Sequence, residues 1–330
     1  MLAADADIPE LHKKTLAETH AELAITTRDL HTLNAALPAK KHRGVMDKTD
    51  NLNEDIGRIA KKFAILHRLW IISSLFLIKN NPDVNLRSAS RWESPAAKHD
   101  AILTELFMAM PEPLHKEMAK YKSFSSVFTS TLNQERSNML HAIKEASALI
   151  FAPLKVPDAT IFASPACKRD DAEMKQLSIY KGEYHRLAPI VFADPNQMTP
   201  DGFLRSVVLL NVLCLLLFGR NALNKEKACG GPKARGQIHS IHSMTEGLIA
   251  LAMIFVCYLL SPDPELQIVG SETKIPYEAD YDFYLEHLFK RSKWAIDTVS
   301  WFNMELFGSK QQTSVAAEPR APPAPTFWTT

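Results

Sequence analysis

Two short apolar stretches constrain the fold of this chain more than any other feature of its sequence. Residues 206–218 and 247–260 are almost uninterrupted runs of aliphatic and aromatic side chains. Both runs are much shorter than the roughly 20 residues that a helix needs to cross a bilayer. Arg205, Arg220 and Glu246 flank them, and charges are costly at membrane depth. We therefore expect two helices that pack against each other inside a protein core.

Apolar residues recur at helical spacing elsewhere in the chain, and glycine is scarce, with 11 residues in 330. A sheet protein would instead show strict alternation and frequent glycine-rich turns. The sequence predicts an all-α fold: an irregular multi-helix globular domain with an N-terminal amphipathic helical arm and a disordered Pro-rich C-terminal tail. Membrane association through residues 203–218 and 247–260 is the alternative interpretation of the apolar runs.

Proline-rich and polar stretches divide the chain. We expect a helical arm at 1–45, a helical region at 46–152, a helical domain at 153–308 and a disordered tail at 309–330. Within the second part, an apolar stripe predicts a helix over about 55–78. The polar loop that follows it, at 80–98, is the clearest internal boundary.

Leucines recur every seven residues near the N-terminus, at Leu16, Leu23, Leu30 and Leu37. This spacing places them on one stripe of a helix and predicts an interface along the arm. The positions three residues before each leucine are polar, whereas a coiled coil needs two apolar positions per heptad. We expect a helix that docks on the main body, with a coiled coil as the alternative.

Capping residues predict the ends of the two apolar helices. Thr199 and Pro200 form a helix start, and Gly219 closes the same helix. Ser243 with Glu246 three residues later forms a capping box for the second helix.

The charge balance limits the kinds of ligand that are expected, and the cysteines indicate the cellular compartment. Lysine and arginine number 38 against 37 acidic residues, a net charge of +1, so no global field attracts nucleic acid or anionic lipid. None of the four cysteines stands in a Cys-x-x-Cys pair, which indicates free thiols in a reducing compartment. The N-terminus lacks the pattern of a secretory signal. We expect an intracellular protein, in the cytoplasm or nucleus.

No pattern predicts a catalytic residue, a metal site or a cofactor. The spacing of Cys229, His239, His242 and Cys257 fits no common zinc module, so a buried thiol and loop histidines are expected. Four acidic residues are expected to form a solvated face near a helix N-terminus: Glu278, Asp280, Asp282 and Glu286.

The segment from Arg220 to Gly236 is locally basic. Its positive side chains are candidates for contacts with nucleic acid or phosphate: Arg220, Lys225, Lys227, Lys233 and Arg235. Lysines and arginines on a flexible loop can neutralise phosphates without reading a base sequence. The loop does not satisfy the Gly-x4-Gly-Lys-Ser/Thr pattern and follows no predicted strand, so a nucleotide P-loop is not expected.

A series of short motifs extends from about residue 165 to residue 308. Among them are Gly202-Phe203-Leu204-Arg205-Ser206, Thr245-x-Gly247-Leu248-Ile249-Ala250, Leu260-Ser261-Pro262-Asp263, Tyr281-Asp282-Phe283-Tyr284 and Phe302-Asn303-x-x-Leu306-Phe307-Gly308. In order and spacing the series resembles an uncharacterised domain family that occurs in many copies in mushroom-forming basidiomycete fungi. The resemblance implies a lineage and no activity, ligand or catalytic residue.

The sequence favours a non-enzymatic interaction or accessory protein that engages an unknown protein partner or a second copy of itself. An arm with a leucine stripe and a Pro-rich tail can both bind partners without an active-site pocket. The alternative is a nucleic-acid-associated factor that uses the basic loop at 220–235.

Overall fold

The structure is a computed structural model of the whole chain. It describes residues 48–77, 80–154, 159–164, 167, 171–180, 183–224 and 233–311. The leucine stripe of the predicted arm and nearly all of the predicted tail lie outside the described residues. The chain divides into two compact units, Met1–Asn51 and Leu52–Thr330, and the fold described here is that of the second unit.

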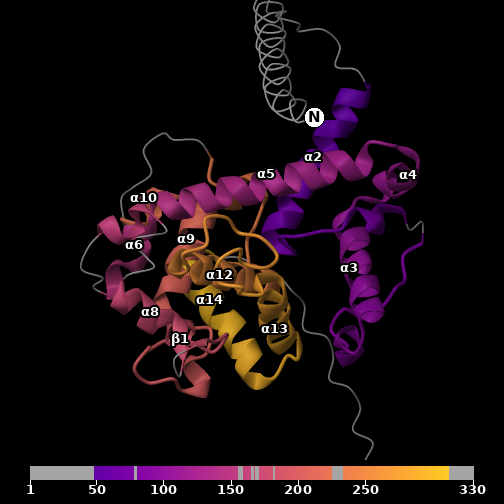
Figure 1. The fold of residues 1–330 in the computed structure, drawn as a ribbon. Coiled ribbons are helices and arrows are strands. Elements are labelled where there is room, and N and C mark those ends of the chain that lie inside the picture. The colour runs from indigo at the N-terminus through magenta and orange to yellow at the C-terminus, as the bar shows by residue number, and fades with distance from the viewer. Residues whose placement is uncertain are drawn as a thin grey trace, which may run out of the picture. The chain divides into compact units, whose positions relative to one another are not determined.

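The prediction of an all-α fold is confirmed, since the described residues form helices and one pair of very short strands (Figure 1). The α-helices are α2 (Lys48–Leu66), α3 (Pro95–Ala109), α4 (Glu112–Lys120), α5 (Phe124–Glu145), α6 (Ser147–Phe151), α8 (Ala172–Ser178), α9 (Val207–Phe218), α10 (Arg220–Leu223), α11 (Arg235–Ile238), α12 (Glu246–Leu260), α13 (Tyr277–Phe289) and α14 (Lys293–Gln311). The 3-10 helices are η1 (Ser73–Leu77), η2 (Ala89–Trp92), η3 (Ala152–Leu154), η4 (Ala159–Ala163), η5 (Pro189–Val191) and η6 (Pro200–Gly202). Strands β1 (Ile179–Tyr180) and β2 (Glu183–Tyr184) pair antiparallel, with Ile179 opposite Tyr184.

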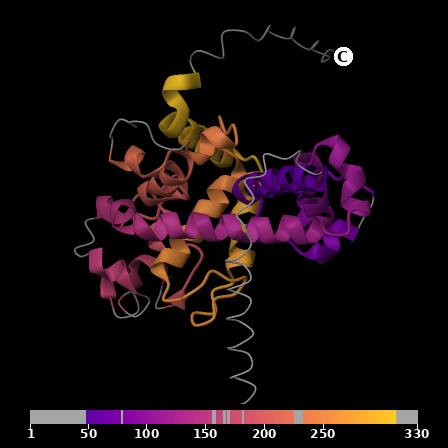
Figure 2. The same ribbon diagram turned by 90° about the horizontal axis from the view of Figure 1, so that it is seen from above.

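Helices α9 and α12, which contain the two apolar runs, pack against each other at the centre of the unit. Every residue of α12 after Glu246 is buried, and the helix contacts α5, α8, α9 and α13. The long helix α5 crosses this pair on one side in both views (Figures 1 and 2). Among the described helices, none combines the length and the apolar character that a membrane crossing requires.

Helix α9 begins later than the sequence predicts. Thr199 and Pro200 start the 3-10 turn η6 instead, and Leu204 with a φ of 57° then interrupts the helical path. Ser206 is the cap of α9, since its side chain accepts a hydrogen bond from the Val208 N–H. At the other end the prediction is correct, because Gly219 closes α9 with a φ of 86°, where a side chain would be strained.

The cap of α12 is Thr245, not the predicted Ser243. Thr245 Oγ1 accepts a hydrogen bond from the Leu248 N–H and donates one to the Leu66 carbonyl at the end of α2. The cap therefore involves a contact between Thr245 and Leu66, which are far apart in the sequence, and the predicted capping box of Ser243 and Glu246 contains no such contact.

Helix α2 ends at Leu66, so the predicted helix over 55–78 stops more than two turns early. The Tyr281 hydroxyl of α13 donates a hydrogen bond to the His67 carbonyl, and the next side chain, Arg68, turns into the interior. The chain then continues through η1.

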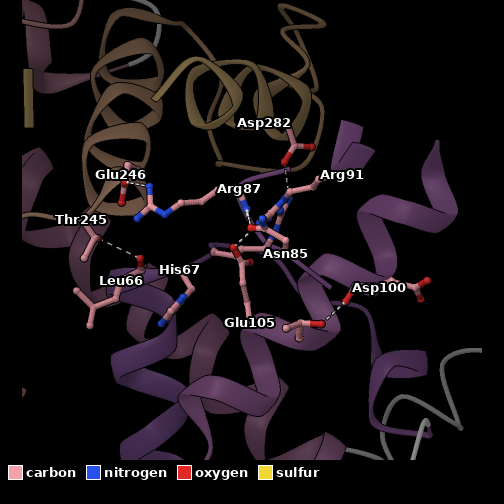
Figure 3. Close-up of polar contacts among 12 residues, drawn as sticks. Leu66, His67, Asn85, Arg87, Arg91, Asp100, Glu105, Thr245, Glu246 and Asp282 are labelled. Carbon is pink, nitrogen blue, oxygen red and sulfur yellow. Dashed lines mark hydrogen bonds and ion pairs between the residues drawn. The ribbon is translucent and has the colours of Figure 1, made fainter. Parts of the chain in front are cut away.

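The loop at 80–98, predicted as an internal boundary, lies against α12 and α13. Arg87 pairs with Glu246 at the start of α12 (Figure 3). Both Arg87 and Arg91 lie over the ring of Phe289. Arg91 also pairs with Glu105 of α3 at 2.7 Å. We call the set of polar contacts that joins the end of α2 and this loop to α3, α12 and α13 the polar seam. Its contacts are made by Leu66, His67, Arg68, Arg87, Arg91, Lys98, Glu105, Thr245, Glu246, Tyr281, Asp282 and Phe289.

The predicted solvated acidic face of α13 is wrong for two of its four members. Asp280 and Asp282 are buried, while Glu278 and Glu286 are half-buried. Asp282 accepts a 2.7 Å hydrogen bond from Arg68, whose side chain is 1% exposed, and it also pairs with Lys98. Burial tends to lower the pKa of Arg68, but the neighbouring carboxylates, led by Asp282, outweigh it and raise the pKa.

Asp280 lies on the opposite side of this helix from solvent. It accepts a 2.6 Å hydrogen bond from Tyr184 and pairs with Arg186. Burial raises the pKa of Asp280 in spite of these two partners. Tyr277, Tyr281 and Tyr284 on the same helix all belong to the core. Because α13 packs against the interior through these tyrosines, the acidic residues between them are buried as well.

Asp263 organises the loop between α12 and α13. Its carboxylate accepts hydrogen bonds from the backbone N–H groups of Glu272 and Thr273 and from the hydroxyls of Thr273 and Tyr277. Burial tends to raise the pKa of Asp263, but these hydrogen bonds stabilise the charged form and lower it. Gly270 leaves room for the carboxylate, since a Cβ at that position would collide with it.

The Gly247→Ala variant is expected to lose about 2 kcal/mol of unfolding free energy, because the new Cβ would collide with the Leu66 carbonyl. Urea denaturation measures this loss. Gly308→Ala in α14 is the control: its Cβ would make only ordinary contact, and its stability should be unchanged or slightly higher. Equal effects of the two substitutions would contradict the close approach of α12 to α2.

The Asp263→Asn variant is expected to be less stable by about 3 kcal/mol at pH 7, since it loses charge-assisted hydrogen bonds at a buried site. Because the folded-state pKa of Asp263 is lowered, its contribution is present above the unfolded-state value near 3.8 and is lost as the pH falls through the folded value. Urea denaturation at pH 7 and near pH 3 should therefore give a difference between wild type and variant that shrinks in acid. A difference that is the same at both pH values would refute this role.

Candidate functional site

A groove of about 990 Å³ opens between α2, α5, the end of α9 and α11. It is lined by Glu54, Asp55, Gly57, Arg58, Lys61, Thr131, Glu135, Leu215, Leu216, Gly219, Lys233, Ala234, Arg235, Ile238 and His239. A second hollow, of about 770 Å³, lies against the Ser- and Thr-rich face of α5, but its lining residues include no apolar side chain. The groove combines charged and apolar groups and is the candidate site.

One wall of the groove is the exposed face of α2. Its inner face carries Ile56, Ile59 and Phe63, which are buried in the core. The outer face carries the exposed residues Glu54 and Asp55, followed at three- or four-residue spacing by Arg58 and Lys61 on the same side of the helix. The polar seam fixes the C-terminal end of α2, so this wall has a set position within the unit.

The opposite wall is the short segment around α11. Gly236 packs so closely on α9 that a Cβ there would lie 2.8 Å from the Leu217 carbonyl oxygen. This contact brings Lys233, Arg235 and Ile238 to the edge of the groove. Gly219, with its positive φ, faces open space at the end of α9.

Two ion pairs neutralise part of the charge in the groove. Asp55 pairs with Arg58 at 2.8 Å on the exposed wall, and Glu135 pairs with Arg235 at 2.8 Å where both side chains are largely buried. Among the described residues, Glu54, Lys61 and Lys233 of the groove form no ion pair. The groove thus presents mixed charge, with two lysines and one glutamate that are not paired within the described part of the chain.

The apolar part of the groove is formed by Leu215 and Leu216 of α9 and by Ile238. The two leucines are buried, whereas Ile238 is 58% exposed. An exposed isoleucine next to a buried apolar floor offers a contact that a partner side chain can cover.

His239 closes the inner side of the groove. Burial lowers its pKa, and the opposing effect of Glu135 does not compensate, so the ring is neutral at pH 7. Of the other residues with metal-type side chains, Cys229 lies outside the described residues. Cys257 lies beside the Tyr184 hydroxyl, and burial raises the pKa of its thiol to about 12. Within the described part of the chain, no group of three or more histidine, cysteine or acidic residues could hold a metal ion.

The structure brings together only part of the predicted basic site. Lys233 and Arg235 line the groove, but Arg235 is already paired with Glu135. Arg220 is exposed on α10 and does not line the groove, while Lys225 and Lys227 lie outside the described residues. The α2 side of the groove was not predicted, and its signal in the sequence is the charged outer face of that helix.

The model of a family of unknown function, DUF6698, matches residues 133–307, more than half of the chain. The match begins inside α5 and covers almost all of the stretch whose motifs resemble an uncharacterised family. No curated protein and no solved structure matches the chain.

A fragment of residues 133–307 is expected to remain unfolded, although the family model covers it. It would lack α2 and α3, which belong to the same core, and Asp282 would lose both Arg68 and Lys98. Circular dichroism shows whether the fragment is helical, and thermal unfolding shows whether it melts cooperatively. A fragment of residues 48–311 is the control and should fold like the full chain. Cooperative unfolding of the shorter fragment would show that the polar seam is dispensable.

Proposed function

This chain belongs to the DUF6698 family, and we propose that it is a non-enzymatic protein-interaction module that holds a partner polypeptide in the groove between α2 and α11. The proposal includes an intracellular location. It also includes the predicted arm interface at Leu16, Leu23, Leu30 and Leu37 as a second contact, for a partner or for another copy.

The proposal rests on one observation: the exposed apolar side chain of Ile238 lies in a groove whose walls carry both acidic and basic side chains. An exposed apolar contact flanked by polar and charged side chains is a common composition of a protein-binding surface. Small-molecule sites are instead mostly apolar, with few polar groups. A groove in which acidic and basic side chains are nearly balanced suits a polypeptide, whose own charges can be distributed to match it.

A nucleic-acid-associated role is the second candidate. Its support is that Arg58 and Lys61 of α2 extend the basic character of Lys233 and Arg235 into a common groove. Three carboxylates in the same groove, Glu54, Asp55 and Glu135, weigh against it, because they would repel phosphate groups. We therefore place the protein partner first.

A photo-crosslinking side chain placed at Ile238 is expected to capture a discrete partner adduct in the cells that naturally contain the full-length chain. The residue is exposed in the free chain and would be covered in the complex. The adduct is detected as a band of increased mass and identified by mass spectrometry. It should disappear when Arg58→Glu and Lys61→Glu are introduced together.

Met108 of α3 provides the matched control, because it is also apolar and exposed, at 71%, and lies outside the groove. The same side chain at Met108 should give no such adduct. Identical adducts from both positions, or none from Ile238, would remove the groove from the proposed function.

A further inference from the structure

We infer that the partner segment of the groove carries carboxylates next to an apolar side chain, so that the groove selects acidic, amphipathic polypeptides. This inference rests on the proposed function. It follows from which charges of the groove are paired with other described residues and which are not.

The wall formed by α2 has opposite charge at its two ends. Glu54 and Asp55 lie toward the N-terminus of the helix, and Lys61 lies two turns further on, about 10 Å along the axis. Asp55 is paired with Arg58, so Glu54 at the near end and Lys61 at the far end are the groups of this wall that form no ion pair among the described residues. A carboxylate of the partner would be attracted to the Lys61 end.

The basic end of α2 faces the opposite wall. The charges that act on His239 include those of Lys61 and Lys62 from α2 as well as those of Arg235 and Glu135. Glu135 is paired with Arg235, so the positive charge that remains around the neutral ring of His239 comes from the lysines. Lys233 adds a further positive charge at the edge of the groove, and it forms no ion pair with any residue that the structure describes.

The apolar contact lies beside this positive region. Ile238 directly precedes His239 and is the strongly exposed apolar side chain among the groove residues described. A partner segment that places an aliphatic or aromatic side chain on Ile238 would bring its neighbouring residues close to Lys61 and Lys233. Acidic residues at those neighbouring positions would form charge-assisted contacts.

A polypeptide meets these requirements better than a nucleic acid does. A DNA duplex carries a phosphate charge about every 1.7 Å of its axis, so it would also place phosphates near Glu54, Asp55 and Glu135. A peptide can carry its carboxylates at one end and neutral or basic residues at the other. The groove therefore discriminates by the pattern of charge as well as by its sign.

Selection from a phage library of random short peptides tests the inference. Full-length chain is immobilised, and peptides that bind the support without the chain are removed. Selected peptides should be enriched in aspartate and glutamate next to an apolar residue. In fluorescence anisotropy, a fluorescein-labelled selected peptide should bind the Lys61→Glu, Lys233→Glu double variant at least about tenfold more weakly than wild type, and its affinity should fall with salt.

A charge-matched control is provided by Lys116→Glu with Lys120→Glu. Both lysines are exposed on α4, outside the groove, so this variant has the same net charge but should bind the peptide like wild type. Equal weakening by the two double variants would overturn the inference, since it would show only a general effect of charge.

Two other results would also overturn it: enrichment of basic or uncharged peptides, or no enrichment at all. Tight, salt-dependent binding of labelled duplex DNA that is lost in the groove variant would replace the inference with the nucleic-acid alternative. The crosslinking at Ile238 distinguishes these failures from a failure of the proposed function. A specific adduct there, together with non-acidic selected peptides, keeps the groove as an interaction surface and rejects only the acidic partner.

Discussion

Helix α12 has no polar face after its first residue, so the chain must enclose it on every side. An apolar helix that is exposed to water on any side loses the free energy gained by burying that surface, about 25 cal/mol for each Å². The neighbours that enclose α12 come from distant parts of the sequence, including α5, α8, α9 and α13. This requirement explains why α5, α8, α9 and α13, which are far apart in the sequence, share one core with α12.

Charges buried near α12 add specificity to this apolar packing. A buried pair such as Arg68 and Asp282 contributes little net stability, because desolvation offsets most of the attraction. Removing one partner would nevertheless leave an uncompensated charge in the interior. The polar seam therefore favours one arrangement of α2 relative to α13 over others that would bury as much apolar surface. The same arrangement sets the position of the groove wall that α2 forms.

The sequence was sufficient to predict what depends on local pattern. The buried apolar runs, the predominance of helix over strand in the described residues and the closure of α9 by Gly219 all follow from composition and spacing within a few residues. The start of α12 at Thr245 and the end of α2 at Leu66 were missed, because hydrogen bonds between distant helices determine them. For the same reason, Asp280 and Asp282 were placed in solvent. Of the groove, only Lys233 and Arg235 were predicted, since the contribution of α2 depends on how the helices assemble.

The burial of Cys257 has a consequence for how this chain responds to thiol reagents. Only the thiolate reacts readily, and a thiol with a pKa of about 12 inside α12 is almost entirely protonated as well as shielded from solvent. Cys167, by contrast, is exposed. Alkylation at Cys257 can therefore occur only in molecules whose core has opened, and its rate depends on the free energy of that opening. The chain thus contains a chemical reporter of the integrity of its most deeply buried helix, without any engineered label.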